Sequence, residues 1–261
     1  MKISIIMPCF NAQATIKDSI NSILNQTYTN WELIIYDDAS SDNTRLILDH
    51  YLRVDSRIRV NYNSINLGPG FSRNRAIEQS KGNYITFLDS DDLWHKNKLL
   101  VQLNFMLDKK INFSHHAYKY FSFNNLGNKS YSNKVFKSNT IDKFKYLSKR
   151  GFGYCNTFMF SENLKNNIVF NESSEVCEDF EAFLDFFYQG GKSYGIDDVL
   201  GFIRLSTTTR SSNKKKVIIY MLNVYLLKLK GNSILNLIYF CMYIYDSFMH
   251  KYRITMKLIN K

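Results

Sequence analysis

Four short apolar runs, each followed by a segment with helical periodicity, constrain the fold of residues 1–110. The runs are rich in β-branched and aromatic residues, whereas the segments between them place apolar residues three or four positions apart. Parallel neighbouring strands need a crossover connection, which a helix supplies. The alternation therefore predicts an α/β fold with a doubly wound, mostly parallel sheet, whose first strands are Ile3–Met7, Trp31–Tyr36, Arg57–Tyr62 and Tyr84–Leu88.

The fourth run ends abruptly in three carboxylates, Asp89, Asp91 and Asp92. Open α/β sheets bind ligands in the crevice beyond the carboxyl ends of their strands, which is where these acids are predicted to lie. Asp89 and Asp91 are two residues apart and can direct oxygen atoms toward one point, as a hard cation such as Mg²⁺ or Mn²⁺ requires. An isolated Asp-x-Asp leaves open the alternative of a solvated loop that binds nothing.

The second run also ends in acids, Asp37 and Asp38. Because the carboxyl ends of parallel strands meet at one edge, both acidic ends are expected to line one polar site for a ligand that has hydrogen-bond donors and phosphates. Gly68-Pro-Gly70 does not match the dinucleotide-binding fingerprint, and the chain contains no P-loop motif. Dehydrogenases and P-loop NTPases are therefore disfavoured, and the glycines are expected to let the chain turn closely past the ligand.

Beyond residue 110 the periodicity is less regular. His115 and His116 lie in a predicted strand and are expected to be structural or exposed rather than metal ligands. A polar, flexible segment is expected at residues 206–212. The remaining predictions are strands at Phe113–Phe123, Asn156–Phe160 and Val199–Leu205, and a turn at Asn124–Asn128.

An acidic segment, Glu175–Asp179, leads into one further predicted helix. Glu178 and Asp179 fall in its first turn, where the helix macrodipole favours ionised carboxylates. This position leaves open whether the two acids only compensate the dipole or also take part in chemistry. The expected buried face of the helix consists of Phe180, Phe183, Leu184 and Phe187.

Composition limits the cellular setting and the partners. The 261 residues include four scattered cysteines without a C-x-x-C spacing, which is typical of a reducing compartment, and residue 1 leads directly into a strand without a signal-peptide pattern. A cytoplasmic protein is therefore expected. The net charge is +11, but residues 214–261 hold nine Lys or Arg against one acid, Asp246. No nucleic-acid motif accompanies this charge, so nucleic acid is not an expected partner.

The basic segment 214–261 contains two apolar runs, 217–227 and 234–245, around Gly231–Ser233. Each run is shorter than the ~20 residues that a membrane-spanning helix requires. With its flanking lysines, the segment is predicted to form a helical hairpin that lies on an anionic membrane surface. The alternative is a pair of helices packed against the main domain or a partner subunit.

Taken in order and spacing, several motifs resemble family 2 glycosyltransferases of the GT-A fold, which is Rossmann-like. They are Ser4–Asn11, Tyr36–Asp42, Asn66-Leu67-Gly68 and Leu88–Asp92, and Glu178-Asp179 is similar to the acidic motif of that family. The resemblance is close over the first 110 residues. It implies a GT-A domain at 1–213, with a nucleotide-binding half at 1–110 and an acceptor-side half at 111–213, followed by the tail at 214–261.

The resemblance also implies roles for single residues. Pro8 and Phe10 would line the base pocket, with Phe10 stacked on the ring in place of the tyrosine often found there. Asp38 would hydrogen-bond the uracil and Arg73 would lie near the nucleotide. Toward the sugar, Asp89 would face the ribose, Asp91 would hold Mn²⁺ or Mg²⁺ on the pyrophosphate, and Asp179 would deprotonate the acceptor hydroxyl.

These roles predict an inverting, metal-dependent glycosyltransferase, peripheral on the inner face of the cell membrane. It would move one sugar from a nucleotide-sugar, expected to be a UDP-sugar, to a lipid-linked oligosaccharide of a bacterial surface polysaccharide. One alternative is a non-catalytic scaffold of a polysaccharide synthase complex that binds the nucleotide-sugar without turnover. Another is a sugar nucleotidyltransferase, which would need a glycine-rich, basic loop where Cys9–Thr15 has neither glycine nor base.

Overall fold

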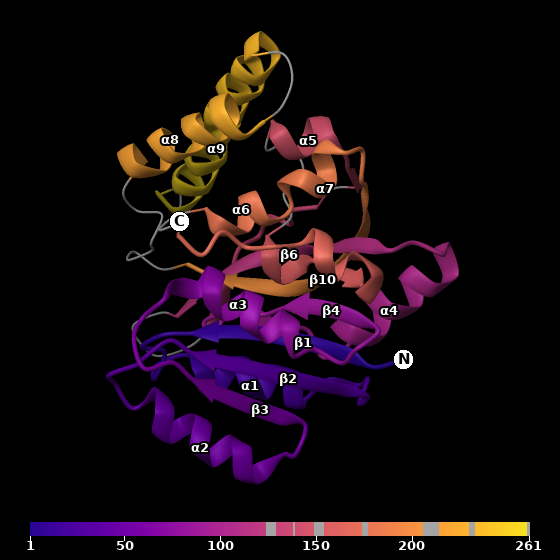
Figure 1. Cartoon of the computed structure of the whole chain (residues 1–261), viewed down its shortest axis with the longest axis vertical. Helices are drawn as coiled ribbons and strands as arrows, with labels where there is room; N and C mark the ends of the chain where they lie inside the picture. Colours follow the sequence, from indigo (N-terminus) through magenta and orange to yellow (C-terminus); the bar gives the residue numbers. More distant parts are fainter. Residues whose placement is uncertain are drawn as a thin grey trace.

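The computed structural model describes residues 1–123, 129–137, 139–148, 154–173, 177–205, 214–229 and 233–259. Its centre is one mixed sheet with the strand order β3-β2-β1-β4-β9-β6-β10-β5, in which β7 also pairs with β6 and β8 with β10 (Figure 1). The first four strands are parallel to one another, which confirms the predicted doubly wound half. They are β1 (Ile3–Cys9), β2 (Trp31–Asp37), β3 (Ile58–Tyr62) and β4 (Tyr84–Phe87).

Alternating side chains of these strands enter two different hydrophobic cores. On β1, Ile5 packs with α1, α2 and α4, whereas the adjacent Ile6 packs with α3 and the later helices. Because successive side chains of a strand point to opposite faces, a continuous apolar run is what a sheet covered on both faces requires. The helices of this half are α1 (Ile16–Leu24), α2 (Thr44–Val54), α3 (Gly68–Glu78) and α4 (Lys98–Lys109).

Gly68 and Gly70 lie in the first turn of α3. Gly68 has a φ of +88°, in the left-handed region that glycine adopts at no steric cost. A Cβ on Gly70 would lie 2.7 Å from the carbonyl oxygen of Asn171. Glycine is therefore required here, and it lets the segment that precedes the acidic helix pack directly on α3.

The second half of the sheet mixes strand directions. The strands are β5 (Leu93–Trp94), β6 (Phe113–Phe123), β7 (Lys129–Tyr131), β8 (Thr140–Ile141), β9 (Met159–Ser161) and β10 (Ser193–Arg204). β6 and β10 are parallel, whereas β9 runs antiparallel to both of its neighbours, β4 and β6. The strand predicted at 156–160 begins only at Met159, because Cys155–Thr157 form a 3₁₀ helix. The turn predicted at 124–128 and the polar segment at 206–212 lie outside the described residues.

The prediction of a single helix that contains Glu178 and Asp179 in its first turn is wrong in one respect. It is divided at Phe183 into α6 (Glu178–Ala182) and α7 (Leu184–Tyr188), one turn each, and α5 (Lys143–Leu147) packs beside α7. Phe183 and Phe187 are buried as predicted, whereas Phe180 is partly buried.

The last helices are α8 (Lys214–Asn223), a π-helical turn at Val224–Lys228, and α9 (Ser233–Ile259). They cover α6, as Figure 1 shows, and Met221, Val224, Tyr225 and Tyr243 are buried in the same core as α6 and α7. The inner face of these helices therefore packs against the main domain, as the alternative to a membrane-bound hairpin expected. Within the described residues, no helix is both long and apolar enough to cross a membrane.

Candidate active site

Arg73 connects two acidic segments that are far apart in the sequence. This buried side chain of α3 donates from Nη2 to Asp89 Oδ1 at 2.7 Å and from Nη1 to Glu178 Oε1 at 2.9 Å. Burial opposes its charge, but Asp89 and Glu178 outweigh burial and hold the pKa of the guanidinium above its usual value. Arg73 thus brings the end of β4 and the start of α6 together, as a permanent cation between two carboxylates.

Asp91 is half-buried and lies close to Asp89 and Arg73. Burial, and then the negative charge of Asp89, raise the pKa of Asp91 to about 6, although Arg204 and Arg73 act in the opposite direction. A bound cation is stabilising beside a carboxylate whose charge its surroundings disfavour. The donor set is hard oxygen, as Mg²⁺ or Mn²⁺ requires.

The described residues contain no group of three or more His, Cys, Asp or Glu side chains that could hold a metal ion on their own. This is compatible with Mg²⁺ chemistry in phosphate-transfer sites, where one or two protein carboxylates share the ion with substrate phosphates and water. Asp91, with Asp89 beside it, therefore fits a metal that binds together with a diphosphate. It does not fit a preformed structural metal site.

Asp92 has a structural role that the sequence analysis did not separate from its neighbours. It is buried, and its carboxylate accepts hydrogen bonds from Asn156 Nδ2 at 2.5 Å and from the backbone N–H of Arg204 at 2.8 Å. Burial, followed by the charge of Asp91, raises its pKa well above the usual range. Asp92 thus ties the acidic loop to the end of β10.

Arg204 is a site residue that the sequence analysis missed. Its Nε donates to the carbonyl oxygen of Asp91 at 2.9 Å, and its guanidinium lies 4.9 Å and 4.8 Å from the ring centres of Phe121 and Phe123. Its Nη2 is buried and has no hydrogen-bond partner among the described residues. The signal available in the sequence was a basic residue at the end of a predicted strand, on the same edge as the acids.

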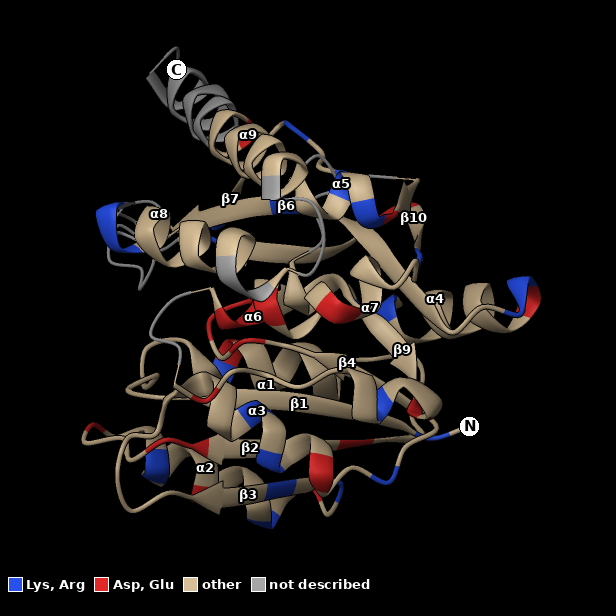
Figure 2. Cartoon of the chain, turned by 45° about the horizontal axis from the view of Figure 1, so that its top comes forward, with Lys and Arg blue, Asp and Glu red and all other residues tan. Residues whose placement is uncertain are grey.

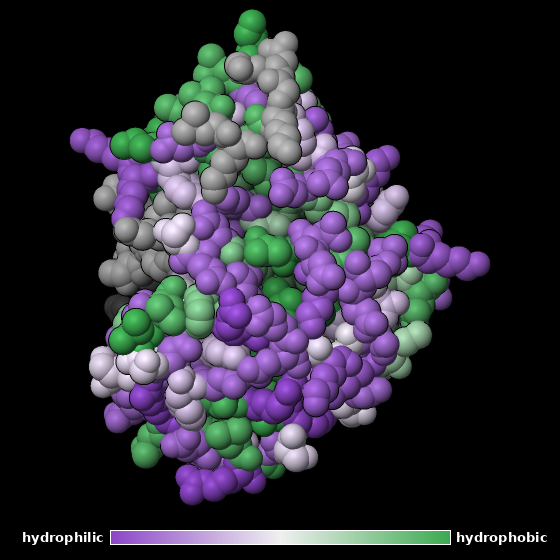
Figure 3. Space-filling model, viewed as in Figure 1, coloured by the Kyte–Doolittle hydropathy of each residue, from purple (hydrophilic) through white to green (hydrophobic). Residues whose placement is uncertain are grey.

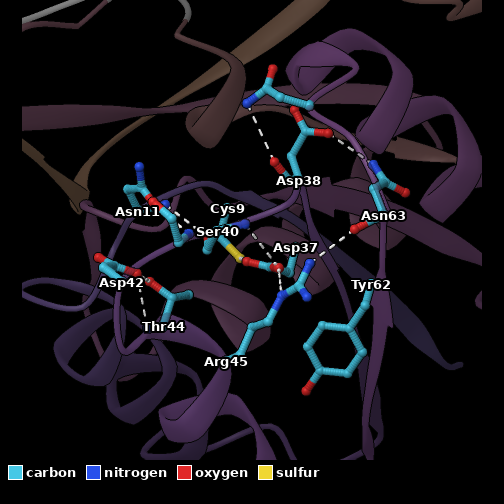
Figure 4. Close-up of polar contacts among 12 residues, drawn as sticks. Cys9, Asn11, Asp37, Asp38, Ser40, Asp42, Thr44, Arg45, Tyr62 and Asn63 are labelled. Atoms are coloured by element: carbon cyan, nitrogen blue, oxygen red, sulfur yellow. Dashed lines mark hydrogen bonds and ion pairs between the residues drawn. The ribbon is translucent and has the colours of Figure 1, made fainter.

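Asp38 lies at the opposite end of the site, at the carboxyl end of β2 (Figure 4). Its carboxylate accepts hydrogen bonds from Asn63 Nδ2 at 2.9 Å and from the backbone N–H groups of Leu67 and Gly68 at 2.8 Å and 2.7 Å. Asp38 therefore holds the start of α3 against β2. Its expected contact with a uracil stays a prediction, and would use lone pairs that these bonds leave.

Asp37 is committed to the interior, as Figure 4 also shows. Its carboxylate accepts from Arg45 Nε at 2.7 Å and from the backbone N–H of Ser40 at 3.2 Å, and the Cys9 thiol lies 3.8 Å away. Burial, and then the Asp37 charge, raise the pKa of Cys9, so this thiol is not a reactive nucleophile.

Pro8 lies near the end of β1, and Phe10 follows the strand directly, next to these acids. Pro8 is buried and is the β1 partner of Tyr36, whereas Phe10 is 49% exposed. An exposed aromatic ring beside a polar strand end suits stacking on a flat ligand. The stacking of Phe10 on a nucleotide base stays a prediction.

Backbone strain is concentrated next to these residues. Four described non-glycine residues have positive φ, and three of them adjoin candidate side chains. Asn11 (47°) follows Phe10, Ala39 (61°) follows Asp38, and Cys177 (57°) precedes Glu178. Such conformations cost about 1–3 kcal/mol each and cluster at functional sites, because surrounding contacts must impose them.

The comparisons with known proteins agree with this geometry. The model of glycosyl transferase family 2 matches residues 4–166. This chain belongs to that family. A relative is the UDP-Glc:alpha-D-GlcNAc-diphosphoundecaprenol beta-1,3-glucosyltransferase WfgD of Escherichia coli, which is 38% identical over 82% of this chain and 81% of WfgD.

Two solved structures show the same fold. The crystal structure of S. aureus TarS 1–349 in complex with UDP-GlcNAc has a TM-score of 0.71 at 20% identity, covering 94% of this chain and 72% of TarS 1–349. The mannosyltransferase PcManGT from Pyrobaculum calidifontis, in complex with GDP-Man and Mn²⁺, has a TM-score of 0.65 at 14% identity, covering 88% and 65%. These likenesses confirm the GT-A fold, and the family model and WfgD confirm the glycosyltransferase class.

Within this glycosyltransferase, Glu178 and Asp179 occupy different environments. Glu178 is buried and paired with Arg73, whereas Asp179 is half-buried and accepts the backbone N–H of Phe180 at 2.8 Å. Burial, and then Glu178, raise the pKa of Asp179, whereas Arg73 and the backbone N–H of Phe180 act in the opposite direction. The ionised state expected for Asp179 at the start of this helix stays a prediction. A carboxylate with a raised pKa is the better proton acceptor.

Proposed function

We propose that this glycosyltransferase moves one sugar from a UDP-sugar to a hydroxyl of a lipid-linked oligosaccharide, during synthesis of a bacterial surface polysaccharide. The observation that supports the proposal is the bridge from Asp89 through Arg73 to Glu178, because it joins the end of β4 to the helix turn that carries Asp179. WfgD, whose name states a UDP-Glc donor and a diphosphoundecaprenol-linked acceptor, supports the donor and acceptor classes.

The nucleotide would bind along the strand ends from β1 to β4. Phe10 would stack on the base beside Pro8, Asp38 would accept a hydrogen bond from the uracil, and Asp89 would face the ribose. Arg73 holds Asp89 in place at 2.7 Å, so a donor would meet an oriented carboxylate rather than a mobile one. Arg73 itself would lie near the nucleotide, with its guanidinium paired to Asp89 and Glu178.

Asp91 would hold Mn²⁺ or Mg²⁺ on the diphosphate of the donor. When bound, such an ion neutralises the negative charge that develops on a diphosphate leaving group. PcManGT, described with GDP-Man and Mn²⁺, supports a divalent metal in this fold. Arg204 donates a hydrogen bond to the Asp91 carbonyl oxygen and so holds the acidic loop after β4 in place. It would also be a second cation near the Asp91 carboxylate.

Asp179 would act as the base. It would take the proton of the acceptor hydroxyl while the hydroxyl oxygen attacks the anomeric carbon, and the bond to the UDP oxygen would break on the opposite face. One displacement inverts the anomeric carbon, so an α-linked donor would give a β-linked product. Glu178 would not compete for this role, because its charge is paired with Arg73.

We further propose that the enzyme is peripheral on the cytoplasmic face of an anionic membrane. The sides of α8 and α9 that face away from the core expose apolar residues, and exposed Lys215 and Lys216 begin α8. Apolar burial combined with basic charge is how interfacial helices bind anionic lipid. Figure 3 shows hydrophobic atoms at the top of the molecule, over these helices; the exposed residues are Ile218, Ile219, Leu226, Ile234, Leu235, Leu237, Ile238 and Tyr245.

The test is a panel of UDP-sugars, with GDP-mannose as the donor control, incubated with GlcNAc-diphospholipid acceptors and either Mn²⁺ or EDTA. We expect metal-dependent UDP release together with a lipid product one hexose or N-acetylhexosamine heavier, with a β linkage by NMR. Calorimetric UDP-sugar binding without release across the panel would support the scaffold alternative and contradict the enzyme. Release of GDP but not UDP would overturn the assigned donor.

A further inference from the structure

The short helix that carries Asp179 is held from above by the C-terminal helices. Figures 1 and 2 show α8 and α9 lying over α6, whose acids form a red cluster beneath α8 in Figure 2. Glu181, two residues beyond Asp179, accepts a hydrogen bond from the hydroxyl of Tyr220 on α8. Asn171 Nδ2 donates to the same oxygen of Glu181 at 3.0 Å, so the segment packed on α3 joins this contact.

Phe180, which follows Asp179, is enclosed by tyrosines. Tyr146 of α5 stacks on its ring at 4.8 Å with an angle of 8° between the planes, and donates its hydroxyl to the Phe180 carbonyl oxygen at 2.5 Å. Tyr225 and Tyr243, from the tail, lie with ring centres 6.0 Å and 5.5 Å from that of Phe180. Two of the three rings around the residue next to Asp179 thus come from the tail.

External contacts are needed because α6 cannot define its own orientation. It has five residues, starts from Cys177 in the left-handed region, and has no side-chain cap on its first turn. Isolated helices shorter than ~12–15 residues are marginal in water. The Arg73–Glu178 pair holds the start of α6, and the tail contacts hold the two residues that flank Asp179 on its C-terminal side.

We propose that Tyr220, Tyr225 and Tyr243 are positioning residues for Asp179, so that the tail at 214–261 completes the catalytic site. This inference rests on the proposed role of Asp179. Tyr220 orients α6 through Glu181, and the two buried rings fix the backbone at Phe180. The same two helices therefore face the catalytic helix on one side and expose the apolar surface proposed for lipid on the other.

Tyr220→Phe is the most conservative test, because it removes one hydroxyl and keeps the ring. We expect kcat to fall by ~10- to 100-fold, the size of effect that a displacement of about 1 Å produces at a reacting group. The donor KM and the calorimetric Kd for UDP should stay within about twofold, because the hydrogen bonds described for Asp38, Asp89 and Asp91 are made with partners other than Tyr220. Tyr243→Leu, which removes a ring from Phe180, should show the same split between kcat and KM.

The matched control is Tyr51→Phe. The Tyr51 hydroxyl donates to Asn21 Oδ1 at 2.9 Å in the core on the other face of the sheet, so its loss costs a comparable hydrogen bond far from Asp179. We expect Tyr51→Phe to lower Tm by about as much as Tyr220→Phe does, and to leave kcat unchanged. If Tyr220→Phe keeps kcat within twofold of wild type while Asp179→Asn abolishes transfer, the positioning inference is wrong. If Asp179→Asn itself retains transfer, the fault lies with the proposed base.

Discussion

Asp91→Asn should make the ligand-free protein more stable while abolishing its activity. In the fold, burial and Asp89 raise the pKa of Asp91 from 3.8 to about 6, so above pH 6 the folded protein holds a charge that its surroundings disfavour. A rise of that size corresponds to ~3 kcal/mol at full strength. Since Asp91 is only half-buried, solvent screening reduces the expected gain to about 1–3 kcal/mol.

The sign follows from proton linkage. The folded protein keeps its Asp91 proton to higher pH than the unfolded chain, so the penalty appears as pH rises from about 4 to about 6 and is complete above that range. The advantage of the asparagine should therefore be full at pH 7.5, about half as large at pH 5, and absent below pH 4.

The assay is chemical denaturation in EDTA at pH 7.5 and pH 5, with Asp108→Asn as the control for loss of an exposed carboxylate. When Mn²⁺ and UDP are both added, wild type should become the more stable of the two proteins, because only wild type should bind the metal tightly. A variant less stable than wild type at pH 7.5, or a difference independent of pH, would refute the electrostatic reasoning. Near-normal sugar transfer in saturating Mn²⁺ would refute the metal role.

Three further predictions concern the base, the base pocket and the tail. Asp179→Asn should keep UDP-sugar affinity within a few-fold and lose ~10²–10⁴ in transfer rate, whereas Glu178→Gln with intact binding and no transfer would reassign the base. For wild type, kcat should fall with decreasing pH through a pKa above the usual aspartate value, because burial and Glu178 raise that of Asp179. Phe10→Ala should weaken UDP binding by ~5- to 100-fold, and Phe10→Tyr should restore it, as titration calorimetry would show. The double variant Lys215→Glu, Lys216→Glu should bind anionic vesicles more weakly than wild type at low salt. At 0.5 M NaCl wild type should bind as weakly as the variant, because salt screens the charges. Unchanged sedimentation of the variant with vesicles at low salt would contradict the membrane role.

The sequence alone determined the first half of the sheet and the edge that carries the site. Strands buried on both faces leave a local signal, a continuous apolar run, and the acids at their ends are visible because they interrupt it. Asp38, Asp89 and Asp91 could therefore be assigned to one edge before any coordinates. The order of the motifs was likewise enough to indicate the family, which the family model then confirmed.

The differences among the acids come from contacts between distant parts of the chain. Arg73 and Glu178 are 105 residues apart, and no local pattern reports a pair of that separation. Asp92 is distinguished from Asp91 by its contacts with Asn156 and β10, not by its neighbours in the chain. Burial and long-range charge, which set each pKa, exist only once the chain has folded.

The tail shows the same division most clearly. Its composition and two apolar runs indicated amphipathic helices, but hydrophobicity does not say which apolar residues meet a protein core and which meet solvent or lipid. Packing on α6 selected Tyr225 and Tyr243 for the interior and left Ile219 and Leu237 outside. The five-residue helix beneath them takes its orientation from those contacts, because one helical turn has too few internal hydrogen bonds to define a direction by itself.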